Sequence, residues 1–66
     1  MEVKIMTTYK RIDGATSEVE PKEETKYGNG IDYNINIQRG ADGLFHYSVL
    51  RFDNEEDYIR YRKING

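Results

Sequence analysis

The clearest pattern in the chain is a strict alternation of apolar and polar side chains over residues 31–38. Polar residues stand between the apolar positions Ile31, Tyr33, Ile35 and Ile37. A period of two is typical of a β-strand that buries one face. A glycine-rich turn follows at residues 39–43, and residues 44–52 are mostly good strand formers. The pattern therefore predicts two antiparallel strands joined by a turn.

Polarity also predicts how these two strands pair. If the turn is centred on Ala41, Ile37 faces Phe45 and Tyr33 faces Val49, so that one face is apolar. If a helix covers that face, the other face exposes a strip of mixed polarity: Asn34, Asn36, Gln38, Leu44, His46, Ser48, Leu50 and Phe52. Such a strip is typical of a protein-binding surface. The alternative is that a loop or the N-terminal hairpin covers it.

Residues 53–66 carry several independent signs of a helix. Asp53 or Asn54 can cap the first free N–H groups, while acidic residues fill the first turn and basic residues the last. The helix should lie on the sheet through a broad apolar stripe: Tyr58, Ile59, Tyr61 and Ile64.

The N-terminal half is less regular. Alternation and two adjacent threonines favour a strand over residues 3–12, although a three-residue spacing of apolar positions would also suit a helix. Asp13-Gly14 is typical of a tight hairpin turn, after which residues 15–20 could return as a polar edge strand. Proline cannot donate to a strand ladder, so Pro21 should end that strand. We interpret residues 20–30 as a mobile acidic loop.

These elements predict one small α+β domain over residues 1–66, with an antiparallel sheet of three to four strands and one C-terminal helix packed on one face. A chain of 66 residues is marginally stable. It has no cysteine and one histidine, so neither a disulfide nor a metal site can supplement the core. A homodimer would provide additional buried area.

The stretch KYGNGI at residues 26–31 resembles the YGNG signature of the pediocin-like bacteriocins. In that family the motif precedes a disulfide-bonded, cationic sheet and a membrane-active helix. This chain has no cysteine and a net charge of -2, and the similarity is confined to these few residues. We therefore interpret Gly28-Asn29-Gly30 as a turn that leads into the following strand.

The sequence offers little support for catalysis or metal binding. His46 and Ser48 share a strand face, but no third group orients the histidine and a flat sheet provides no pocket. The adjacent carboxylates match no EF-hand spacing, and Gly40-Ala41-Asp42-Gly43 lacks the lysine of a phosphate-binding loop. We expect no enzymatic activity, no cofactor and no bound metal.

Charge favours a protein partner over nucleic acid. Ten basic residues stand against twelve acidic ones, whereas nucleic-acid-binding domains are usually basic. The acidic segment would steer a basic partner through four side chains: Glu18, Glu20, Glu23 and Glu24. We predict a non-catalytic protein-binding module, in concrete form a phage or mobile-element inhibitor or accessory protein acting on a host nucleic-acid-handling protein. The alternative is a small nucleic-acid-binding protein that uses its sheet face.

The expected location is the cytoplasm. The first residues do not combine a basic segment with an apolar one, as a signal peptide would. No apolar run approaches the roughly 18 residues that a membrane-spanning helix requires. We therefore expect no membrane partner.

Overall fold

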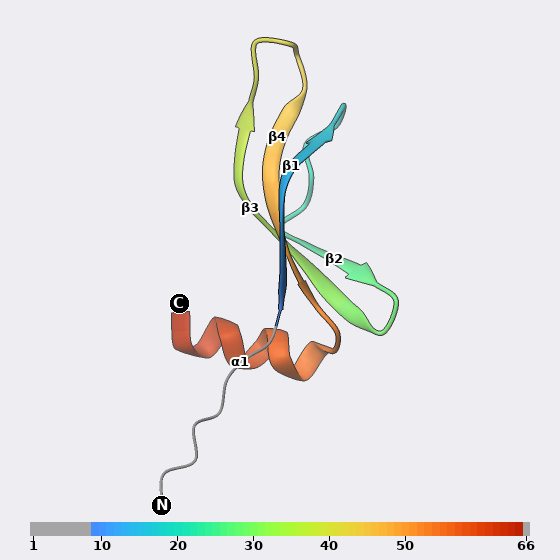
Figure 1. The fold of residues 1–66 in the computed structure, drawn as a ribbon, viewed down its shortest axis with the longest axis vertical. Coiled ribbons are helices and arrows are strands. Elements are labelled where there is room, and N and C mark those ends of the chain that lie inside the picture. Colours follow the sequence, from blue (N-terminus) through green and yellow to red (C-terminus); the bar gives the residue numbers. More distant parts are fainter. Residues whose placement is uncertain (1–8, 66) are drawn as a thin grey trace, which may run out of the picture.

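In the computed structural model, which describes residues 9–65, a four-stranded antiparallel sheet is followed by one helix (Figure 1). The elements in chain order are β1 (Lys10–Ser17), β2 (Glu24–Tyr27), β3 (Gly30–Arg39), β4 (Phe45–Phe52) and α1 (Glu55–Asn65). The strands lie in the order β1-β4-β3-β2, and every neighbouring pair is antiparallel. The predicted α+β class, with a small antiparallel sheet and a C-terminal helix, is confirmed.

The core lies where α1 crosses one end of the sheet and packs on β3 and β4 (Figure 1). Its centre is Phe52 at 0% exposure, whose ring lies 5.5 Å from that of Tyr58 and 5.4 Å from that of Tyr61. Tyr9 covers the same ring from the β1 side, with a centroid distance of 5.3 Å. Most of the core is thus aromatic, and tilted or edge-on ring contacts of this kind are favourable.

The helix begins as the sequence predicts, but its buried face is narrower. Asn54 rather than Asp53 is the cap, because its Oδ1 accepts the Asp57 N–H at 2.9 Å. The predicted apolar stripe is wrong in part, since Ile59 is 50% and Ile64 70% exposed. The aromatic rings that pack on the sheet are large enough to cover this end of it by themselves.

The predicted pairing of β3 with β4 is wrong. Tyr33 pairs with Leu50 and Ile35 with Ser48, one residue beyond the expected partners. The register shifts again at Asn36 and Ile37, which together stand opposite Tyr47 as a β-bulge. Asn36 adopts the left-handed conformation with a φ of 56°, which asparagine tolerates better than most residues.

In the corrected register, the side chains of β4 lie on the faces of the sheet opposite to those predicted. Leu50 and Phe52, which the sequence analysis expected on an exposed strip, point toward α1 and are 1% and 0% exposed. Tyr47 and Val49 point to the opposite face instead. Leu50 is therefore a core residue and presents no side chain to a partner.

The pair Asp13-Gly14 is a bulge inside β1 and not the predicted hairpin turn. Ile12 pairs with Val49 and Ala15 with Tyr47, so the two residues stand opposite the single residue Ser48. Gly14 supplies the positive φ, 79°, that this geometry uses. The strand consequently continues to Ser17, and the part of the predicted first strand that precedes Tyr9 lies outside the described residues.

Residues 18–23, here called the crossing segment, connect β1 at one edge of the sheet to β2 at the other. They pass over the face that α1 leaves free, because Asn34 lies on that face and its Nδ2 donates to the Lys22 carbonyl at 2.7 Å. The interpretation of residues 20–30 as a loop is wrong for residues 24–27, which form β2 and pair with the start of β3, whereas residues 20–23 belong to no strand. The expected turn at Gly28 is confirmed, with a φ of 58°.

Candidate functional site

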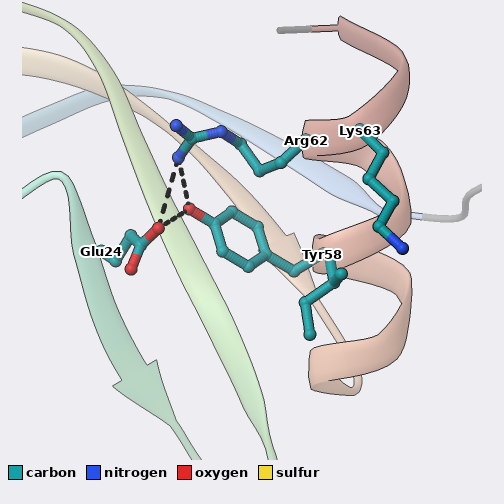
Figure 2. Close-up of a pocket in the computed structure, with 5 residues that line it drawn as sticks. Glu24, Tyr58, Arg62 and Lys63 are labelled. Atoms are coloured by element: carbon teal, nitrogen blue, oxygen red, sulfur yellow. Dashed lines mark hydrogen bonds and ion pairs between the residues drawn. The ribbon is translucent and has the colours of Figure 1, made fainter.

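A shallow cleft of about 330 Å³ lies between α1 and the start of β2 (Figure 2). Its lining consists of Glu24, Tyr58, Ile59, Arg62 and Lys63. Glu24 is the first residue of β2, and the other four side chains come from two successive turns of α1. The cleft is therefore formed by the same packing that creates the core.

A hydrogen-bonded cluster closes the inner wall of this cleft. The Tyr58 hydroxyl donates to the Glu24 carboxylate, and Arg62 Nη1 donates to the Tyr58 oxygen at 2.7 Å and to Glu24 at 3.2 Å (Figure 2). The same nitrogen lies 3.5 Å from Glu23. Burial first, and then the hydrogen bond to Glu24, raises the pKa of Tyr58 to about 12. These hydrogen bonds join two helical side chains to the first residue of β2, so the cluster ties α1 to β2.

We expect Tyr58 to ionise only near pH 12, and stability to fall as the pH rises from 10 toward that value. The phenol pKa is 10.0 in the unfolded reference and about 12 in the fold, so in this window the folded state holds the extra proton. An ultraviolet titration of tyrosinate, compared between wild type and Tyr58→Phe, isolates this group. A difference spectrum that titrates near pH 10 would contradict the assignment.

The predicted polar strip is divided between the two faces of the sheet. Gln38, His46 and Ser48 remain together on the α1 side, beyond the end that the helix covers. Asn34 lies on the opposite face, where it is buried and holds the crossing segment. Asn36 is exposed in the bulge. The strip is therefore not the continuous surface that the sequence suggested.

His46 and Ser48 each bind a different carboxylate. His46 Nε2 lies 2.9 Å from Asp42 at the hairpin turn, whose side chain also accepts the Leu44 N–H at 3.0 Å. That backbone hydrogen bond, followed by the one to His46, lowers the pKa of Asp42. Leu44 itself is half-buried in the turn. This arrangement stabilises the turn.

Ser48 is held by the β1 bulge. Its Oγ donates to Asp13 Oδ1 at 2.8 Å, and Arg11 Nε donates to the same oxygen at 3.0 Å. The hydrogen bond from Ser48, and then that from Arg11, lowers the pKa of Asp13. Because the Ser48 proton is committed to Asp13, the serine and His46 do not form a nucleophile and base pair.

The four predicted acidic residues fall into two pairs. Glu23 and Glu24 are engaged by Arg62 and serve the tie between α1 and β2. Glu18 and Glu20 are exposed, and no ion pair involves them within the described residues. Between them stands Val19 at 72% exposure, the most exposed large apolar side chain of residues 9–65. Sequence reasoning missed Val19, although an isolated apolar residue between two acids was the available signal.

Most arginines of the sheet and helix already have acidic partners. Arg51 Nε donates to Asp32 at 2.9 Å, and its guanidinium lies 3.6 Å from the centroid of the Tyr27 ring. Arg60 pairs with Asp57 at 3.2 Å. Binding of phosphates would have to break such contacts, which weakens the nucleic-acid alternative.

Comparison with known proteins found no matching family model, no similar curated protein and no similar solved structure. Within residues 9–65, no helix has the length and apolar character needed to cross a membrane. The same residues contain no group of three or more histidine, cysteine or acidic side chains arranged to hold a metal ion. The function is therefore argued from the geometry of the cleft and of the crossing segment.

Proposed function

We propose that this protein is a non-catalytic binding module that recognises a basic protein through the crossing segment. One observation carries the proposal. Val19 stands out from the surface between Glu18 and Glu20, whose charges no cation contacts within the described residues. An exposed apolar side chain bordered by free carboxylates is suited to an apolar pocket with a lysine- or arginine-rich rim.

The anchoring of the crossing segment supports this proposal. The Val19 N–H donates to Ser17 Oγ at 3.2 Å, and Asn34 fixes the far end through Lys22 and Glu23. A segment that is already ordered loses less conformational entropy when it binds. The crossing segment can therefore present Val19 at a small entropic cost.

The class of partner follows from its required charge. Proteins that handle nucleic acids carry lysine and arginine on their phosphate-binding surfaces, so they offer the basic rim that Glu18 and Glu20 would contact. We propose a host protein of this class as the partner. A phage or mobile-element origin and a cytoplasmic location stay predictions.

Capture from nuclease-treated bacterial lysate, read by mass spectrometry, tests the proposal. We expect the wild type to retain a specific basic protein, and the variant Glu18→Gln/Glu20→Gln to lose it. The charge-matched control Asp53→Asn/Glu56→Gln alters exposed acids elsewhere and should retain the protein. Equal loss in both variants would mean that net charge alone explains capture, and would reject the crossing segment as the binding element.

A further inference from the structure

The outer surface of α1 is chemically complementary to the crossing segment. Ile59 is 50% exposed there, although isoleucine is usually buried. Ile59 also lines the cleft of about 330 Å³, and Lys63 stands beside it (Figure 2). Lys63 has no acidic contact within the described residues. This surface thus combines an exposed apolar side chain with a lysine that no acid contacts within residues 9–65.

We infer that the protein associates with itself, and that Val19 of one copy enters the cleft beside Ile59 of the next. In this contact Glu18 or Glu20 would pair with Lys63. The inference rests on the proposed function in that it uses the same segment, and it identifies a second copy, through Lys63, as a further partner of that segment. Apolar burial and charge complementarity then act together at one contact.

A neighbouring hollow on α1 has a smaller volume, about 230 Å³, and is lined by Glu56, Ile59, Arg60 and Lys63. Each hollow therefore has one glutamate and one arginine beside Ile59 and Lys63. In the larger cleft, Arg62 is shared between Glu23 and Glu24. Charge does not separate the two hollows, and the larger volume favours the cleft as the site for Val19.

The crossing segment begins where β1 ends, remote from α1, and runs back to β2, so that its last residue, Glu23, contacts Arg62 (Figure 1). Val19 stands near the start of the segment, so it and the cleft belong to two different surfaces of one chain. A contact between two different surfaces is heterologous. Such a contact adds copies head to tail, until a ring closes or a filament continues to grow.

Sedimentation equilibrium over a range of protein and salt concentrations tests the association. We expect the average mass of the wild type to rise with protein concentration and to fall with added salt. Val19→Asp and Lys63→Glu should each weaken association at least about tenfold, which corresponds to roughly 1.4 kcal/mol. The control Lys10→Glu changes a lysine of β1 and should associate normally. A wild type that stays monomeric throughout would overturn the inference.

Mixing two defective variants tests the head-to-tail arrangement. Val19→Asp keeps the α1 surface, and Lys63→Glu keeps the crossing segment. The two altered surfaces are both acidic and repel each other, so an equal mixture retains only one working contact. Each variant alone should associate weakly, while the mixture should form a complex of one copy of each and nothing larger. A mixture that stays monomeric would overturn the inference. If the wild type still captures a basic protein from lysate in that case, the proposed function stands independently.

Discussion

Replacing Phe52 by alanine is expected to leave the chain largely unfolded at room temperature. The Phe52 ring is inaccessible to solvent and contacts the rings of Tyr58 and Tyr61, so its removal opens a cavity where α1 meets the sheet. Such a truncation costs about 3–5 kcal/mol. A domain of this size with a single core has a total stability of only about 3–5 kcal/mol. Circular dichroism and urea unfolding measure the effect.

The matched control is Ile64→Ala, which truncates an apolar side chain that is 70% exposed on α1. Surface substitutions of this kind usually change stability by less than about 0.5 kcal/mol. We expect the control to unfold at nearly the wild-type urea concentration. If Phe52→Ala were as stable as Ile64→Ala, the core would not lie between α1 and β4, and the corrected register would be wrong.

Replacing Gly30 by alanine should have the second largest effect. The backbone carbonyl of Phe52 occupies the place where a Cβ at residue 30 would stand. The carbonyl belongs to the backbone and the Cβ is bonded directly to it, so neither can move aside without disturbing the adjacent Ile31 and Phe52 pair. Overpacking typically costs about 1–3 kcal/mol, and a clash between backbones belongs at or above the upper end of this range. Urea unfolding of the variant measures the cost.

Gly28→Ala provides the control for Gly30. No atom lies within 4 Å of a Cβ built at Gly28, so that position has space. Its φ of 58° is left-handed, which costs a residue with a side chain roughly 1–2 kcal/mol. We expect Gly30→Ala to be clearly more destabilising than Gly28→Ala. Equal losses would show that backbone conformation, and not the close approach of β3 to β4, decides the effect.

The elements with one clear period were predictable. Ile31, Tyr33 and Ile35 alternate with polar residues because they lie on the face of β3 that packs against the core under α1, and the helix is marked by its cap and by the order of its charges. These signals are local, so the sequence alone predicts β3, β4, the helix and the fold class. The β2 strand was missed because four exposed residues carry no such pattern.

The register was not predictable, for two physical reasons. Apolar residues occupy both faces of β4, with Tyr47 and Val49 on one side and Leu50 and Phe52 on the other, so polarity does not choose between pairings. A bulge at Asn36 adds a further residue to β3, and Asp13-Gly14 uses a turn-like sequence for a bulge in β1. Bulges depend on the neighbouring strand, which a local pattern cannot reveal.

The candidate site was predictable only in its acidic character. The sequence placed Glu18, Glu20, Glu23 and Glu24 in one segment but could not divide them. Arg62, which engages the second pair, follows Glu23 by 39 positions in the chain. The distinction between structural and free carboxylates therefore required the fold, as did the exposure of Val19.

The central claim is that Val19 and its two glutamates bind a basic partner. Its most direct test is the affinity of the purified captured protein for wild type and for Val19→Ser, with Ile64→Ser as the control. Full burial of a valine side chain contributes about 1.5–3 kcal/mol. We therefore predict at least an approximately tenfold loss for Val19→Ser and an unchanged affinity for the control. Unchanged affinity for Val19→Ser would contradict the account.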